Sequence, residues 1–228
     1  MSNHRIVFIC IFFMTSLLFI GCHHSPEEKV YNYLEEGAQV ETTFQEESAS
    51  FIALEKEEVE IYEQMVTLPV EEMEKITTLV EEAISLAEER TQLLEQEKQI
   101  MKEAFEQYET AKDAMDELQT VEESIVLEMK RWIKERENAY FSLHDRYVEG
   151  IEKDIQLYES MTNEELTMEE LKEQVQAIND IYEQVEEDQQ TFNDATKAFN
   201  EVKTELYEEL GFQVKMKETK DTEKHEEK

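Results

Sequence analysis

The sequence predicts an all-α protein, folded as an elongated antiparallel bundle of long helices with coiled-coil-like packing. Three observations support this prediction. Beyond residue 25, only two prolines and three glycines interrupt the 228-residue chain. The rest is rich in Glu, Lys, Gln, Leu and Ala, which favour helices. Apolar residues also recur every three and four positions over long stretches, as they do on the buried face of a helix.

Residues 1–21 read as a cleaved lipoprotein signal peptide. Arg5 precedes an apolar run over residues 6–20, which is short for a membrane span and has the length of a signal core. The run ends in Leu-Phe-Ile-Gly-Cys, the pattern of a lipobox, so we expect cleavage between Gly21 and Cys22 and lipidation of the Cys22 thiol. The alternative is an ordinary secretory signal followed by an incidental cysteine.

The next two helices are expected over residues 26–68 and 70–118, separated by Pro69. Each has an apolar stripe at helical spacing. The first stripe comprises Val30, Leu34, Phe44, Phe51, Leu54, Ile61, Met65 and Leu68; the second comprises Met73, Ile76, Val80, Ala83, Ala87, Leu94, Met101, Ala104 and Tyr108.

A third helix is expected over residues 121–161, after a turn near Gln119. The stripe keeps its phase through Ile125, Met129 and Trp132, so one very long central helix is the alternative. The fourth helix is expected over residues 168–210, with a capping box of Thr167 and Glu170 at its start and Gly211 as its stop. Together, residues 22–211 form the bundle domain, and residues 212–228 are mostly charged and predict a disordered tail.

Charge limits the classes of partner. The chain has 57 Asp and Glu against 22 Lys and Arg, a net charge of −35, and removing Arg5 with the signal makes it one unit more negative. Nucleic acid is excluded as a direct partner, because phosphates are bound by clustered Lys and Arg. An anionic lipid surface is disfavoured too, so the membrane partner is reached through the lipid on Cys22.

No catalytic residues are expected, and no cofactor or metal site. Cys10 and Cys22 leave no thiol pair in the mature domain, and the carboxylates are too numerous for any one pair to be informative. His144 lacks the Glu-x-x-His spacing of carboxylate-bridged metal bundles and is expected in a polar patch at the bundle surface. The one sign of ligand binding is a polar row on the last helix, made by Gln189, Thr196 and Lys203.

Several short segments along the chain together carry a family resemblance. They are Cys22 with Pro26–Tyr31 and Leu34-Glu35, Leu54–Glu58, Glu82-Ala83 with Arg90, Leu157-Tyr158, Ile178-Asn179 with Tyr182, and Phe192-Asn193 with Thr196 and Asn200. These segments resemble the cell-wall-binding lipoproteins of Bacillus-type bacteria. The resemblance covers nearly the whole mature chain and implies an all-helical lipoprotein on the outer face of a Gram-positive membrane, with a role in wall binding. It carries over no catalytic or binding residues.

The leading hypothesis is therefore a non-enzymatic, membrane-anchored protein between membrane and wall, which contacts a wall polymer or a basic wall-associated protein. Wall polyanions repel an acidic domain, so contact needs bridging cations, amines, or neutral glycan and peptide. The alternative is a small-molecule or ion binder that serves a transporter. In that case a polar cavity is expected at the row of Gln189, Thr196 and Lys203.

Overall fold

The computed structural model describes residues 25–43, 48–163 and 165–212. Its helices are α1 (Pro26–Thr42), α2 (Ser48–Thr67), α3 (Met73–Met115), α4 (Glu123–Ser160) and α5 (Met168–Glu209), with a short 3-10 turn, η1 (Val70–Glu72), before α3. The prediction of an all-α antiparallel bundle is confirmed. The signal peptide, Cys22 and residues 213–228 of the predicted tail lie outside the described residues.

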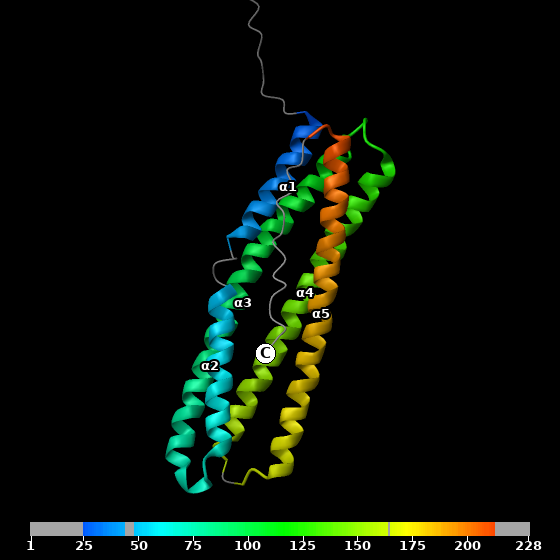
Figure 1. Cartoon of the computed structure of the whole chain (residues 1–228). Coiled ribbons are helices and arrows are strands. Elements are labelled where there is room, and N and C mark those ends of the chain that lie inside the picture. The colour runs from blue at the N-terminus through cyan, green and yellow to red at the C-terminus, as the bar shows by residue number, and fades with distance from the viewer. Residues whose placement is uncertain (1–24, 44–47, 164, 213–228) are drawn as a thin grey trace, which may run out of the picture.

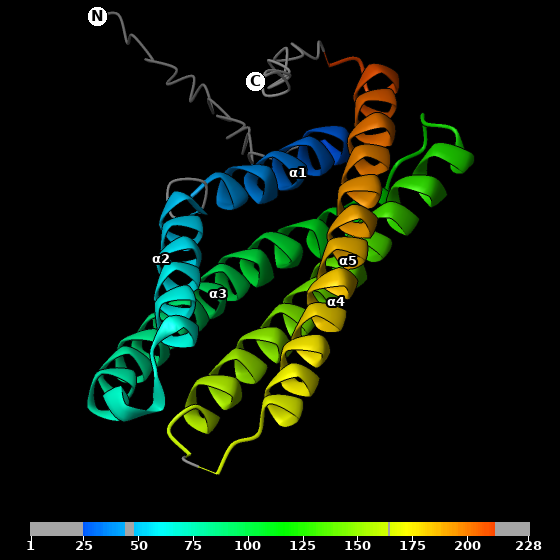
Figure 2. The same ribbon diagram turned by 60° about the horizontal axis from the view of Figure 1, so that its bottom comes forward.

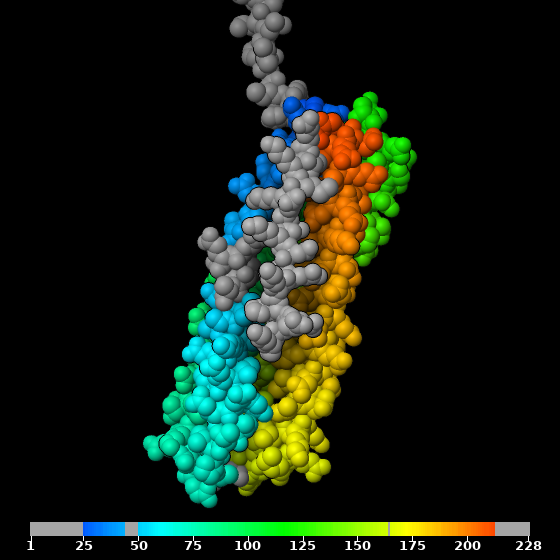
Figure 3. All heavy atoms as spheres, in the orientation of Figure 1, coloured from blue at the N-terminus to red at the C-terminus, as the bar shows by residue number. Residues whose placement is uncertain are grey.

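The bundle consists of two helical hairpins packed side by side (Figures 1 and 2). In the first, α1 and α2 follow one another along α3. In the second, α4 packs along α5, and contacts between α3 and α4 join the hairpins. With 43 residues, α3 is about 65 Å long. Figure 3 shows the elongated outline, with α1 and the end of α5 at one end and α2 and the start of α5 at the other.

The chain turns between α3 and α4: α3 ends at Met115 and α4 begins at Glu123. In contrast, the single first helix expected over residues 26–68 is divided into α1 and α2. The side chains of Thr42 and Thr43 bond to the carbonyls of Gln39 and Val40, and the Thr43 N–H also bonds to the Val40 carbonyl. These local bonds compete with the continuing helix and favour its end.

Both ends of α5 follow the sequence signals. Thr167 and Glu170 form a reciprocal capping box, and Gly211 takes φ +82°, a left-handed conformation that suits glycine at a helix end. Phe212 departs from the prediction of a disordered tail, because its ring stacks on Tyr31 with centroids 4.4 Å apart.

The apolar core is uneven along the bundle. At the α1 end, a single large cluster joins α1, α3, α4 and α5, with Leu34, Tyr108, Met129, Phe199 and Leu206 among its buried members. At the α2 end, the core consists of two smaller clusters, one around Ile61 and Val80 and one around Leu94 and Ile151. Within the described residues, no helix has the length and apolarity needed to cross a membrane.

Candidate functional site

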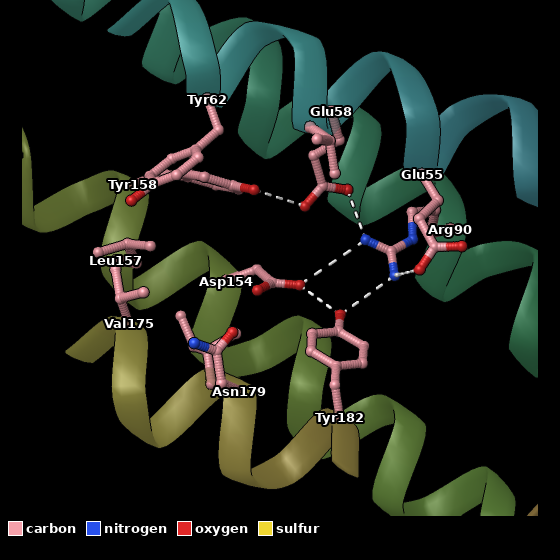
Figure 4. Close-up of a pocket in the computed structure, with 12 residues that line it drawn as sticks. Glu55, Glu58, Tyr62, Arg90, Asp154, Leu157, Tyr158, Val175, Asn179 and Tyr182 are labelled. Atoms are coloured by element: carbon pink, nitrogen blue, oxygen red, sulfur yellow. Dashed lines mark hydrogen bonds and ion pairs between the residues drawn. The ribbon is translucent and has the colours of Figure 1, made fainter. Parts of the chain in front are cut away.

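A buried arginine marks the centre of the α2 half. Arg90 extends from α3 with 2% of its side chain exposed. Its Nη1 donates to Glu58 of α2 at 2.6 Å, and its Nη2 donates to the Tyr182 hydroxyl of α5 at 3.2 Å. Figure 4 shows these residues converging from different helices. Because Arg90 ties α3 to both α2 and α5, it holds the two hairpins together.

Further acidic and phenolic groups complete this network, which we call the Arg90 cluster. Its members are Arg90, Glu55, Glu58, Asp154, Tyr158 and Tyr182. Tyr158 donates to Glu58 at 2.8 Å, and Tyr182 donates to Asp154 at 2.5 Å. Glu55 and Asp154 each lie 3.7 Å from a guanidinium nitrogen of Arg90. Three carboxylates therefore share one arginine.

The excess of carboxylates over arginine in this cluster shifts the pKa values of its members. The pKa of Asp154 is raised to about 7. Burial is the largest cause and the charges of Glu58 and Glu55 add to it, while the Tyr182 hydrogen bond and Arg90 oppose them. Burial lowers the pKa of Arg90, but interactions with Tyr182 and Glu58 outweigh this effect and raise it above its ordinary value. Arg90 thus stays charged, and Asp154 takes up a proton near neutral pH.

A pocket of about 260 Å³ opens beside this cluster. The cluster and Asn179 supply its polar lining, and groups from α2, α4 and α5 supply the rest: Val59, Tyr62, Leu157, Val175 and Ile178. An apolar wall with a few convergent polar groups is the usual character of a small-molecule site. Within the described residues, no group of three or more His, Cys, Asp or Glu is placed to hold a metal ion.

A second buried arginine lies in the α1 half, in what we call the Arg136 cluster (Arg136, Glu41, Tyr108 and Thr196). Arg136 of α4 makes two hydrogen bonds to Glu41 of α1, at 2.6 and 2.8 Å, and one to Thr196 of α5 at 2.9 Å. Tyr108 of α3 donates to the same Glu41 carboxylate at 2.8 Å. Here one arginine meets one carboxylate.

The three residues of the predicted polar row have separate surroundings. Thr196 accepts from Arg136, and Lys203 donates to Glu35 at 3.2 Å, so both have partners inside the bundle. Gln189 lines a second cavity, described below. The structure does not bring the three together in one pocket, and their assignment to ligand binding stays a prediction.

Sequence reasoning missed both arginine clusters, although a signal was present. Arg90 falls at helical spacing between Ala87 and Leu94 of the α3 stripe, and Asp154 falls between Ile151 and Tyr158 of α4. A charged residue at a core position of a helix indicates a buried network. His144 was also misplaced: it is 3% exposed rather than on the surface, because α4 turns its ring inward beside Tyr140.

Comparison with known proteins identifies the family. Residues 25–209 match the family YkyA, described as "Putative cell-wall binding lipoprotein". The chain belongs to this family. It is 26% identical over 205 residues to an uncharacterized lipoprotein YkyA of Bacillus subtilis strain 168, covering 88% of this chain and 91% of the relative. Membership of a lipoprotein family implies a membrane-anchored location at the cell surface.

One solved structure shares the fold. A conserved protein of unknown function from Staphylococcus aureus aligns with a TM-score of 0.54 at 13% identity, covering 80% of this chain and 96% of that one. At this identity the likeness shows the helical fold alone. Within the present chain, Arg90, Tyr158 and Tyr182, which helped carry the sequence resemblance, meet in one cluster.

Proposed function

We propose that the chain is a non-enzymatic lipoprotein, anchored through Cys22 to the outer face of the cytoplasmic membrane. Its acidic helical faces contact a wall polymer or a basic wall-associated protein. The observation that carries this proposal is the segregation of charge. Two arginines, Arg90 and Arg136, are buried and neutralised by carboxylates inside the bundle, so they do not offset the acidic exterior.

Several lysines likewise pair with carboxylates on their own helix or the turn before it. Lys112 pairs with Glu109, Lys134 pairs with Glu137, and Lys75 pairs with Glu72, each three residues away on the chain. In a chain with a net charge of −35, such pairs leave a strongly negative outer potential. This potential favours partners that bring positive charge, or polyanions bridged by cations.

The position of the anchor orients the rod. Ser25 caps α1 and lies three residues beyond Cys22, so the connection to the lipid spans at most about 11 Å. The α1 end would therefore stand near the membrane. The α2 end would stand about 60 Å away, towards the wall, and Arg90, 25 residues before the Met115 end of α3, would lie about 40 Å from the α1 end. A rigid acidic rod of this length suits a contact between the two layers.

Sedimentation with isolated cell walls tests the proposal. The mature domain with Cys22→Ser is mixed with walls at low and moderate salt, with and without calcium, and with walls whose ester-linked amines have been removed by alkali. We expect co-sedimentation that depends on calcium or on the wall amines and weakens with salt. No sedimentation under any condition would exclude direct wall contact and leave a soluble basic protein as the partner to seek.

A matched pair of variants locates the contact. Glu57, Glu60 and Glu63 are exposed on α2, and Glu103, Glu106 and Glu109 are exposed on the α1-facing half of α3. Each triple Glu→Gln change removes the same formal charge. If the wall is met by the far end of the rod, the α2 triple weakens sedimentation more than the α3 triple. Equal effects would show that total charge, rather than the far end, determines binding.

A further inference from the structure

A second cavity lies in the middle of the bundle and contains buried polar atoms without partners. It is about 260 Å³ in volume and receives residues from α2, α3, α4 and α5. His144 and Tyr140 of α4 line it, each 3% exposed. The Nε2 atom of His144 and the hydroxyl of Tyr140 are both buried and make no hydrogen bond. Buried polar groups in native proteins normally have partners, so these two atoms point to a missing one.

The missing partner must be a hydrogen-bond donor. The His144 Nδ1 atom lies 3.2 Å from the Asp145 carboxylate. A carboxylate only accepts, so Nδ1 carries the proton, and in the neutral ring Nε2 is left as an acceptor. The Tyr140 hydroxyl also has free lone pairs, besides its own proton to donate. The nearest carboxylate to Nε2 is that of Glu95, at 3.8 Å, which cannot donate.

The missing partner should also be positively charged. Glu97 of α3 lines the same cavity and makes no ion pair or hydrogen bond within the described residues. Burial raises its pKa to about 7, as expected for a carboxyl without a nearby cation. Glu55 lines the cavity from α2, and its closest cation, Arg90, belongs to the neighbouring cluster. Lys98 does not compensate Glu97, because its ammonium pairs with two carboxylates that do not line the cavity, 3.6 Å from Asp145 and 3.9 Å from Glu95.

The walls and the mouth fit a small organic cation. Phe51 and Tyr147 contact one another edge to face at 5.2 Å and both line the cavity. Aromatic rings attract cations as well as apolar carbon. Ile52, at the rim, is 64% exposed, so the cavity is reached from solvent. Its volume is several times the roughly 30 Å³ that one water molecule occupies in the liquid.

We propose that this cavity binds the primary ammonium group of a small organic molecule or of a wall-borne substituent. An ammonium has three donors and no acceptor. The cavity offers His144 Nε2, the Tyr140 oxygen and the Glu97 carboxylate as acceptors. The inference goes beyond wall contact by the acidic faces, because it concerns a cavity between the helices and a free amine would satisfy it equally.

Nuclear magnetic resonance titration of the Cys22→Ser domain tests it, with alanine methyl ester as the ammonium probe and methyl lactate as its neutral counterpart. We expect a saturable shift of the His144 ring signals with the amine and none with the lactate. Glu97→Gln should weaken amine binding tenfold or more, while Glu103→Gln, at an exposed position on the same helix, should leave it unchanged. Equal binding of methyl lactate, or unchanged affinity in Glu97→Gln, would overturn the proposal.

Two tyrosine variants separate a binding role from a structural one. Tyr140→Phe removes a hydroxyl without a partner, so we expect weaker amine binding with stability equal to or above that of the parent. Tyr158→Phe removes a hydroxyl that donates to Glu58, so we expect lower stability with amine binding retained. Loss of stability in Tyr140→Phe would mean that ordered water alone satisfies the cavity, and would also overturn the proposal.

Competition identifies the source of the ammonium and keeps the test independent of wall contact. Isolated walls are added to the amine-loaded domain, with their ester-linked amines intact or removed. Displacement by intact walls alone would assign a wall-borne amine. Lack of displacement by either would assign a free small amine. Wall sedimentation can fail while the titration succeeds, so failure of one proposal is distinguishable from failure of the other.

Discussion

Each of the two arginine clusters joins four helices, but the two differ in charge balance and packing. In the Arg136 cluster, one arginine makes a two-pronged contact with one carboxylate. Its guanidinium also lies within 6 Å of four aromatic rings, those of Phe105, Tyr108, Phe192 and Phe199. In the Arg90 cluster, three carboxylates share one arginine beside an open pocket.

This difference indicates that the two halves of the bundle have different roles. The α1 half has one carboxylate for its buried arginine, aromatic rings around the guanidinium and a continuous apolar core. These features give it a fixed structure. Unmatched charge and two pockets leave the α2 half able to accept a cation or a proton. A buried ion pair is weak evidence for added stability, but removing one partner leaves the other charge uncompensated. Replacing one partner of a cluster therefore reveals how strongly the rest of that half depends on it.

The largest expected effect comes from Arg136→Ala. It leaves the Glu41 carboxylate without its counter-charge, with the Tyr108 hydroxyl still donating to it, and it leaves the Thr196 hydroxyl without its donor. Arg136 is 5% exposed at this site. We expect the free energy of unfolding to fall by about 3–5 kcal/mol. Urea denaturation of the Cys22→Ser domain measures it, with Arg131→Ala on the exposed side of α4 as control. A loss below about 1 kcal/mol would show that the Arg136 cluster does not fix the α1 half.

Each half has a glycine next to a tyrosine of its arginine cluster. Replacing each glycine by alanine tests how tightly that half is packed. A Cβ on Gly37 would lie 2.4 Å from Tyr108, whereas one on Gly150 would lie 3.3 Å from Tyr182. Alanine favours a helix over glycine by up to about 1 kcal/mol, and overpacking costs about 1–3 kcal/mol. We therefore expect Gly37→Ala to lower the melting temperature and Gly150→Ala to leave it unchanged or raise it. Equal effects would contradict the difference in packing.

The sequence predicted the fold better than the sites, for a physical reason. Helical periodicity is a local property, so the apolar stripes were visible without knowing which faces meet. The division of the first helix was missed because Pro and Gly were taken as the helix-breaking residues, whereas Thr42 and Thr43 end α1 by bonding to their own backbone. Such bonds have no strong sequence signature.

The buried clusters depend on contacts between residues far apart in the chain. Glu58 and Tyr158 are 100 residues apart, and Arg136 and Glu41 are 95 apart. Glu58 falls at helical spacing between Leu54 and Ile61 of the apolar stripe, and this position separates it from its exposed neighbours. What could have been read is that Arg90, Arg136 and Asp154 each occupy a core position of their helix. The identity of their partners required the packed structure.

The smallest effect is expected from Asp154→Asn at pH 5, and its growth with pH tests the charge imbalance directly. The pKa of Asp154 is raised from its ordinary 3.8 to about 7, so folding takes up a proton between these two values. The free energy of unfolding of the parent should therefore fall as pH rises from about 4 to 7. At pH 5, Asp154 is neutral, and asparagine can still accept from Tyr182, so the variant should match the parent within about 1 kcal/mol.

Above pH 7 the ionised Asp154 of the parent adds a negative charge beside Arg90, whereas the variant has no charge at this position. The variant should then be at least as stable as the parent, with a flatter dependence on pH. Glu97, whose pKa is also raised to about 7, contributes the slope that remains. Urea denaturation at pH 5, 6, 7 and 8 measures both chains, with Asp113→Asn at an exposed position of α3 as control. Parallel pH profiles for parent and variant would mean that Arg90 satisfies all three carboxylates, and the contrast between the two halves would then rest on packing alone.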